Sequence, residues 1–344
     1  MPKPRVILAP HFRTMAEIFS PEDIARLRGL SEVVWGRDEP MPQADFEAAL
    51  ADAAAVVFGS WSWGRDAVRK AGPNLRAVFE VGGGHSHKDL DYDACFERGI
   101  FVGSMAPSMA RQVSEMALGL TLAATRGIAL NDRRFRTGQE VYLHKGCANH
   151  LLLYEKTVGF VGCGSLAKGL QPLLEPFGVR VLGYDPWLPQ GHLRRRGIEP
   201  VDLETLFEAS DVIYILAVPT PENKGMVTRA LLERIRPGRV LVLMSRAHLV
   251  DFDALTDLVL AGRFRAAIDV FPKEPVPPDH PIRRAEHAVL SAHCAGATPE
   301  GLREIGLMVV EDLEQVLRDL PPVWMQPAWP GVRRRLVGPK EAGR

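Results

Sequence analysis

Short apolar runs recur along the chain and alternate with segments long enough to form helices. One series begins at residues 5, 32, 55, 77 and 100, with the sequences RVILA, EVVWG, AVVFG, AVFEV and IFVG. A second series begins at residues 157, 179, 211, 239, 264 and 288, with TVGFVG, VRVLGYD, DVIYILAV, RVLVLM, FRAAIDV and AVLSAH. These runs are apolar throughout and recur about every twenty to thirty residues, which is typical of buried parallel strands joined by helices.

Two longer segments have helical periodicity. Residues 109–126 place apolar side chains three and four positions apart, which predicts a helix in the core or between domains. Residues 301–320 form a second amphipathic pattern that could return the chain to the first domain. Residues 135–153 lack clear periodicity and are interpreted as a connecting excursion. The Pro- and Arg-rich tail from residue 321 is interpreted as a solvated end whose last dozen residues are mobile.

The alternation predicts an α/β protein with two doubly wound parallel-sheet domains. We expect a flavodoxin-like substrate domain from residues 1–108 and 298–344, and a Rossmann NAD-binding domain from residues 109–297.

Composition and charge narrow the class of protein. The 344 residues are 46% hydrophobic and 24% charged, as in soluble globular proteins. The 42 basic and 42 acidic residues give no net charge, so neither nucleic acid nor an anionic membrane is an expected partner. The apolar runs at the N-terminus and at residues 212–218 are too short for a secretory signal or a membrane span, which favours a cytoplasmic protein. The four cysteines lack a paired metal spacing, so we expect reduced structural thiols and no metal site.

The stretch VGFVGCGSLAKGL, residues 158–170, predicts a strand that enters a glycine turn and then a helix. Gly162 permits the tight turn, and Gly164 lets the backbone approach a pyrophosphate at the helix N-terminus. Ala167 is small enough to replace the third glycine of the dinucleotide fingerprint. An ordinary strand-to-helix turn is the alternative interpretation of the glycines alone.

Asp185, eighteen residues beyond Ala167 in the sequence, is placed to accept hydrogen bonds from a ribose 2′-hydroxyl. A carboxylate there repels a 2′-phosphate, so NAD is the predicted cofactor. The arginine run at 194–196 could lie near a 2′-phosphate, although a solvated helix face explains it more simply. The full predicted cofactor-binding set is Gly162, Gly164, Ser165, Leu166, Asp185, Val218, Pro219, Ser245 and Asp269.

Three charged stretches follow predicted strands downstream of the fingerprint: LMSRAHLVD, AAIDVFPKEPVPPDHP and LSAHCAGAT. The carboxyl ends of parallel strands face the ligand crevice, which makes Arg246, Glu274 and His293 candidates for catalysis. Each has a structural alternative: Arg246 could pair with a surface acid, Glu274 could be a loop carboxylate, and His293 could be a buried histidine.

These motifs resemble, in order and spacing, those of the D-isomer-specific 2-hydroxyacid dehydrogenases. The likeness covers nearly the whole chain and is weaker before residue 100. It implies that Arg246, Glu274 and His293 are the catalytic trio, that Asp269 lies near the nicotinamide, and that the enzyme is a homodimer acting on a small 2-keto or 2-hydroxy acid.

The chemistry of the trio agrees with that implication. Histidine can give or take a proton near neutral pH, and a hydrogen-bonded Glu274 would orient His293 and favour its protonated form. The planar fork of Arg246 can hold the substrate carboxylate.

The chain departs from the family in EVGGGHSHKDLDYDACFERGI, where an acid is expected at the position of Lys88, and in SMAPSMARQVSE. We predict that Gly84 and His85 bind substrate, with His85 pointing toward it, and that these departures alter the substrate's R group. Two other functions stay open: a short-form 3-phosphoglycerate dehydrogenase, and an NAD(H)-sensing binding protein similar to a transcriptional corepressor.

Overall fold

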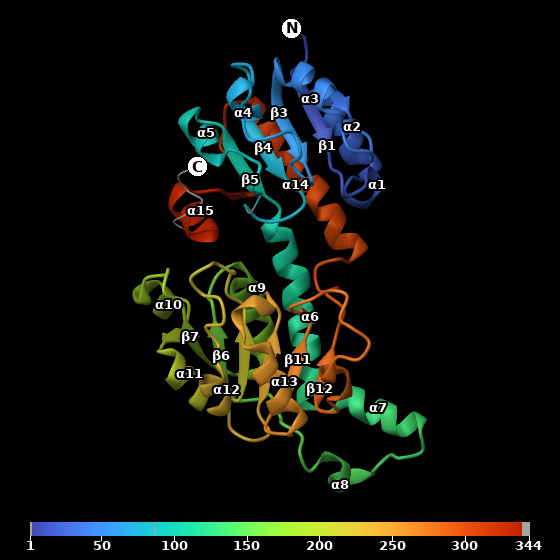
Figure 1. Cartoon of the computed structure of the whole chain (residues 1–344), viewed down its shortest axis with the longest axis vertical. Coiled ribbons are helices and arrows are strands. Elements are labelled where there is room, and N and C mark those ends of the chain that lie inside the picture. The colour runs from blue at the N-terminus through green and yellow to red at the C-terminus, as the bar shows by residue number, and fades with distance from the viewer. Residues whose placement is uncertain (1, 86, 339–344) are drawn as a thin grey trace. The chain divides into compact units, whose positions relative to one another are not determined.

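The computed structural model describes residues 2–85 and 87–338 of the chain. The chain divides into two compact units, the first formed by Met1–Met109 and Ala297–Arg344 and the second by Ala110–Gly296. Figure 1 shows a twisted sheet with helices around it in each unit. The two doubly wound parallel sheets confirm the predicted fold class.

The first unit has a sheet in the order β13-β5-β4-β3-β1-β2, in which the first five strands of the chain follow the flavodoxin-like order 2-1-3-4-5. The strands of this sheet are β1 (Arg5–Ala9), β2 (Glu32–Trp35), β3 (Ala53–Phe58), β4 (Ala77–Glu80), β5 (Phe101–Ser104) and β13 (Gln326–Pro327). All of them pair in parallel except β13, which is antiparallel to β5.

Helices cover both faces of this sheet. They are α1 (Met15–Ile18), α2 (Pro21–Leu30), α3 (Gln43–Leu50), α4 (Ala67–Lys70), α5 (Tyr92–Glu97), α14 (Pro299–Leu317) and α15 (Pro330–Val337). Helix α14, capped by Thr298, packs Ile305 and Val309 against the strands, and each such burial contributes about 1.5–3 kcal/mol. A Cβ at Gly306 would lie 2.0 Å from the Ile18 carbonyl oxygen, so glycine lets α1 and α14 pack closely.

The second unit has a sheet in the order β12-β11-β10-β9-β6-β7-β8, which is the Rossmann order extended by one strand. Its strands, all paired in parallel, are β6 (Thr157–Val161), β7 (Arg180–Tyr184), β8 (Ile198–Pro200), β9 (Val212–Ile215), β10 (Val240–Leu243), β11 (Arg265–Ile268) and β12 (Ala288–Leu290).

Helix α6 (Ala106–Thr125) contains the boundary between the units and packs Ala117 and Leu120 against the second sheet. The remaining helices are α7 (Ile128–Arg136), α8 (Leu143–Cys147), α9 (Ser165–Leu174), α10 (Gln190–Arg195), α11 (Leu203–Ala209), α12 (Arg229–Glu233) and α13 (Phe252–Leu260). Short 3-10 helices cover Glu175–Phe177 (η1), Ala247–Leu249 (η2) and Pro281–Arg284 (η3).

The structure corrects several expectations. Residues 135–153 are not wholly irregular, because α7 ends within them and α8 lies inside them. The C-terminal tail contributes strand β13 and helix α15, so its described part is ordered up to residue 338; residues 339–344 lie outside the described part. Among the described residues no single helix has the length and apolar character for a membrane crossing, and only the bent pair α6 and α7 passes that test jointly.

Candidate active site

The glycine turn follows β6 and opens α9. Gly162 has a φ of +92°, and a Cβ there would lie 2.5 Å from backbone atoms of Ala217, so only glycine fits. At Gly164, the N-cap of α9, no atom lies within 4 Å of the Cβ position, which leaves the backbone open to a ligand. The N–H groups of Ser165 and Leu166 have no acceptor within the described residues. These donors and the helix dipole suit a pyrophosphate.

Asp185 follows β7 and is tied to this turn. One carboxylate oxygen accepts the N–H of Cys163 at 2.9 Å, and the other accepts those of Trp187 and Leu188 at 2.9 and 3.1 Å. A carboxylate has about four lone-pair sites, so Asp185 can still accept a ribose hydroxyl.

Arg196 lies beside the same turn, in contrast to the solvated face expected for the arginine run. Its Nη1 donates to the Cys163 carbonyl at 2.7 Å and its Nη2 to Gln171 Oε1 at 3.4 Å. Arg194 and Arg195 are exposed, as the simpler interpretation predicts. The expectation failed at Arg196 because this guanidinium satisfies a carbonyl of the glycine turn.

Further groups at this edge of the sheet fit a dinucleotide. The Ser245 hydroxyl is buried without a hydrogen-bond partner in the described chain, and Val218, three residues after the end of β9, is 51% exposed. An unsatisfied hydroxyl and an exposed apolar side chain are what a bound nucleotide would cover. The residues present therefore fit the NAD predicted from the fingerprint.

His293, Glu274 and Arg246 lie together beyond the carboxyl ends of β12, β11 and β10. His293 Nδ1 and Glu274 Oε2 are 2.6 Å apart, and the other Glu274 oxygen accepts the Phe271 N–H at 2.9 Å. Arg246 Nη1 donates to the Ser245 carbonyl at 2.8 Å. The His293 and Glu274 side chains are 40% and 36% exposed, so both can reach a ligand.

The charges around Glu274 favour its ionised form. Partial burial opposes ionisation, but hydrogen bonds from His293 and the Phe271 N–H, with the charges of His293 and Arg246, outweigh it and lower the pKa of Glu274. Glu274 is therefore a carboxylate at neutral pH, and His293 Nδ1 must be protonated to donate to it. That leaves Nε2 of His293 for proton exchange.

Asp269 lies beneath the loop that carries His293. It is 1% exposed, and its two oxygens accept the N–H groups of Cys294 and Ala295 at 3.1 and 3.3 Å. His293 has a φ of +53°, which is uncommon outside glycine, and its own N–H donates to the Asp269 carbonyl at 2.8 Å. Asp269 was expected near the nicotinamide; its two oxygens accept backbone N–H groups of the loop that carries His293, and its role toward the cofactor stays a prediction.

In the first unit, His85 is not directed at a ligand, which corrects the expectation for this residue. It is 3% exposed; its Nε2 donates to the Gln326 carbonyl at 2.9 Å and its Nδ1 lies 3.4 Å from Glu80 Oε1. Glu80, fully buried at the end of β4, also accepts the His85 N–H and the Tyr92 hydroxyl. Burial and the Glu80 charge raise the pKa of Tyr92.

The hydrogen bonds of Glu80 with His85 and Tyr92 hold one end of the loop that contains glycines 82–84. A Cβ at Gly82 would lie 2.1 Å from the Gly59 carbonyl oxygen, whereas at Gly84 nothing lies within 4 Å of the Cβ position. Gly84 therefore remains accessible as a substrate-binding residue, a role that stays a prediction. Sequence reasoning missed Glu80 and Tyr92, although Glu80 has the same signal as Asp185: an acid at the carboxyl end of a parallel strand.

The chain is similar to known proteins over most of its length. Residues 118–295 match the family model described as D-isomer specific 2-hydroxyacid dehydrogenase, NAD binding domain. A glyoxylate reductase of Korarchaeum cryptofilum is 32% identical over 258 residues, 74% of this chain and 77% of that protein. A D-3-phosphoglycerate dehydrogenase of Archaeoglobus fulgidus is 30% identical over 269 residues, 78% of this chain and 50% of that protein. The chain thus spans about half the length of several curated relatives it matches.

Solved structures agree with the fold. A phosphoglycerate oxidoreductase from Rhizobium etli is 34% identical, with a TM-score of 0.84 over 95% of this chain and 99% of that one. The apo D-mandelate dehydrogenase of Rhodotorula graminis is 22% identical with a TM-score of 0.80 over 95% of this chain and 98% of that one, a likeness of fold alone.

Proposed function

Because the chain belongs to the D-isomer-specific 2-hydroxyacid dehydrogenase family, we propose that it interconverts a 2-keto acid and a D-2-hydroxy acid with NAD as the hydride carrier. The observation that carries this proposal is the 2.6 Å contact between His293 Nδ1 and Glu274 Oε2, beside Arg246. His293 and Glu274 form an acid-base pair and Arg246 supplies a cation, and all three follow the carboxyl ends of strands in the sheet that also carries the glycine turn.

In the direction of reduction, His293 gives the proton. Glu274 holds the Nδ1 proton and stabilises the imidazolium, so Nε2–H is the group that protonates the carbonyl oxygen. In the reverse direction neutral Nε2 takes the hydroxyl proton. His293 can serve in both reduction and oxidation because Glu274, its partner, stays ionised throughout.

Arg246 binds the substrate carboxylate and polarises the carbonyl. Within the described residues, Nη1 is the only Arg246 nitrogen that makes a hydrogen bond, to the Ser245 carbonyl, and the side chain is exposed. The remaining donors can form a two-pronged contact with a carboxylate.

NAD, when bound, supplies or accepts the hydride at the substrate carbon. Ser165 and Leu166 would hold its pyrophosphate through backbone N–H groups, and Asp185 its ribose. The buried Ser245 hydroxyl and exposed Val218 would contact the cofactor as well, together with Pro219, which follows Val218 in the sequence.

Phosphoglycerate is a second candidate substrate. The observation that favours it is the likeness to a phosphoglycerate oxidoreductase, 34% identical over 95% of this chain. The unusual stretch after β4 leaves the R group open, because Lys88 stands where the family pattern has an acid.

We also propose that the protein is a cytoplasmic homodimer. Side chains on and between α7 and α8 support the dimer: Phe135, Tyr142 and Leu143 are 65%, 67% and 83% exposed. An apolar patch of this kind marks a surface that a partner covers. Sedimentation velocity of the purified protein should show twice the chain mass.

The function is tested by NADH oxidation with glyoxylate, hydroxypyruvate, pyruvate, 2-ketobutyrate, phenylpyruvate and 3-phosphohydroxypyruvate. Turnover of at least one 2-keto acid, with the D-hydroxy acid as product, supports the proposal. Preference for 3-phosphohydroxypyruvate would identify the second candidate. NADH binding without turnover of any substrate in the panel would contradict the proposed reaction.

A further inference from the structure

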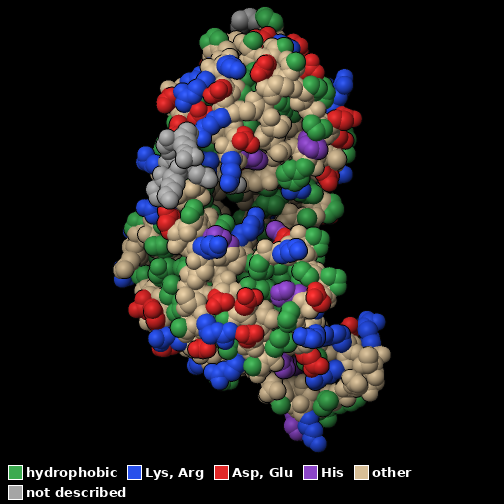
Figure 2. All heavy atoms as spheres, in the orientation of Figure 1, with side chains coloured by type: hydrophobic (Ala, Val, Ile, Leu, Met, Phe, Trp, Pro, Cys, Tyr) green, Lys and Arg blue, Asp and Glu red, His purple; other side chains and the backbone are tan. Residues whose placement is uncertain are grey.

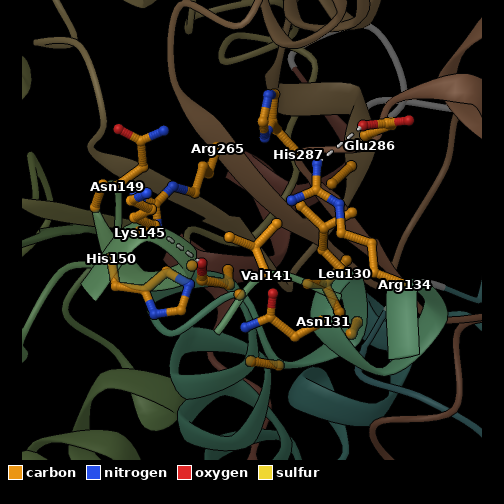
Figure 3. Close-up of a pocket in the computed structure, with 18 residues that line it drawn as sticks. Leu130, Asn131, Arg134, Val141, Lys145, Asn149, His150, Arg265, Glu286 and His287 are labelled. Atoms are coloured by element: carbon orange, nitrogen blue, oxygen red, sulfur yellow. Dashed lines mark hydrogen bonds and ion pairs between the residues drawn. The ribbon is translucent and has the colours of Figure 1, made fainter. Parts of the chain in front are cut away.

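The second unit has a pocket of about 140 Å³ at the amino ends of its strands, whereas the catalytic trio follows their carboxyl ends. Its wall includes Arg265 and Ala288, the first residues of β11 and β12, whereas Asp269 and His293 follow the other ends of these strands. Helices α7 and α8 and the segment 148–150 complete the wall. Figure 3 shows the side chains of this pocket.

The pocket is strongly basic. Arg134, Lys145 and Arg265 line it, together with the histidines 150 and 287, and Glu286 is the one acid among the described residues of its wall. Arg134 lies 3.8 Å from Glu286, an ion pair that Figure 3 marks. In the described part of the chain neither Lys145 nor Arg265 has a carboxylate partner. Figure 2 shows Lys and Arg side chains gathered over α7 as well, which contains Arg133, Arg134 and Arg136.

Arg265 is held in place by the end of α6. Its Nη1 donates to the carbonyls of Ala124 and Thr125 at 3.0 and 2.8 Å. Burial lowers the pKa of Arg265, which means that its charge has lost part of its hydration. A desolvated cation paired only with carbonyls is stabilised by a nearby anion.

His150 adds an unsatisfied group. Its Nδ1 is buried and has no hydrogen-bond partner among the described residues. Burial first, and then the positive charges of Arg265 and Arg126, lower the pKa of His150, so the field here is positive. Figure 3 shows Asn131 and His150 turning their polar ends toward the space between them. A buried polar atom without a hydrogen-bond partner is unfavourable, and a ligand that bonded to it would relieve that cost.

We propose that this pocket binds a small phosphate-type oxyanion, either inorganic phosphate or the phosphate group of a monoester. A tetrahedral oxyanion has acceptors in four directions. Side chains with N–H groups line the pocket from four segments: Asn131 on α7, Lys145 on α8, His150 after it and Arg265 on β11. A carboxylate, with two oxygens in one plane, could use fewer of them at once.

Isothermal titration calorimetry in a phosphate-free buffer tests the proposal, with inorganic phosphate in one titration and glycerol 3-phosphate in another. The wild-type protein is compared with Lys145→Met and His150→Gln. Lys70→Met is the matched control, because Lys70 is an exposed lysine of α4 in the other unit. Arg246→Gln removes the cation of the proposed active site, which distinguishes binding there from binding in the pocket.

We expect saturable binding that weakens tenfold or more in Lys145→Met and in His150→Gln, and stays unchanged in Lys70→Met and Arg246→Gln. The side chain of Lys145 is exposed and makes no ion pair within the described chain, so its variant should keep the wild-type melting temperature. Tighter binding of glycerol 3-phosphate would identify a monoester, and tighter binding of phosphate the free ion. Absence of saturable heat, an equal loss in Lys70→Met, or a loss only in Arg246→Gln would overturn the proposal.

Discussion

Replacing Asp269 by asparagine removes the support beneath His293 with little change in volume. The asparagine side chain would keep one oxygen for a backbone N–H but turn an NH₂ group toward the other, so one donor is left unpaired. The affected N–H groups belong to Cys294 and to Ala295, which is 4% exposed. An unpaired buried donor costs about 1–3 kcal/mol of unfolding free energy. For a unit of this size the melting temperature should fall by roughly 2–4 °C per kcal/mol.

The kinetic effect should exceed the effect on stability. A shift of about 1 Å in a catalytic group can cost roughly 100-fold in rate, so we expect kcat to fall about 10- to 100-fold. Asp269 is 1% exposed and its two oxygens accept backbone N–H groups, so we expect the dissociation constant of NADH to change less than about twofold. Steady-state kinetics and NADH fluorescence titration measure the two quantities separately.

Asp202→Asn is the matched control. Asp202 caps α11 by accepting the Thr205 N–H at 2.8 Å, and asparagine is an equally good cap. This variant should keep wild-type kcat and melting temperature. Wild-type kcat in Asp269→Asn, or a loss explained entirely by weaker NADH binding, would refute the positioning role of Asp269.

The contacts of the second unit and two buried thiols support three further predictions. Glu274→Gln should lower kcat about 10- to 100-fold, because His293 Nδ1 loses its carboxylate partner; steady-state kinetics measure this loss, and wild-type kcat in the variant would contradict the pairing. Asp185→Asn should raise kcat/KM for NADPH relative to NADH about fivefold to tenfold by removing a repulsive charge of about 1 kcal/mol, and an unchanged ratio would contradict the assigned ribose contact. Burial raises the pKa of Cys95 and of Cys163 to about 12, so at pH 8 a thiol reagent should label only the other two cysteines of the folded protein. The unfolded thiols lose their protons from about pH 9, while the folded ones keep theirs. The urea concentration at half-unfolding should therefore be lower at pH 10 than at pH 8.

Much of the fold could be predicted because buried parallel strands are apolar throughout. Every strand of the described chain except β8 and β13 was recognisable in this way. Strand β8 (Ile198–Pro200) and strand β13 (Gln326–Pro327) were missed, because edge strands of two or three residues contain polar positions and proline. Helix α15 was missed since arginines at 333–335 gave it no apolar face.

The site could be predicted where reactive side chains come soon after the carboxyl end of a strand. His293, Glu274 and Arg246 come together because β12, β11 and β10 are neighbours in one sheet. The sequence does not show what each side chain contacts. The ring of His85 donates a hydrogen bond to the carbonyl of Gln326, which is 241 residues away in the sequence and lies beside it because β13 joins the sheet. Long-range pairings of this kind depend on the tertiary fold rather than on local pattern.

The most direct test of the central claim is 2-keto acid reduction by wild-type protein and His293→Asn, measured as NADH oxidation with the best substrate of the panel. We expect wild-type turnover and a loss of at least about 100-fold in kcat in the variant, as for removal of a general acid, with NADH binding retained. Activity of the variant within about threefold of wild type would show that His293 is not the acid-base group and contradict the proposed mechanism.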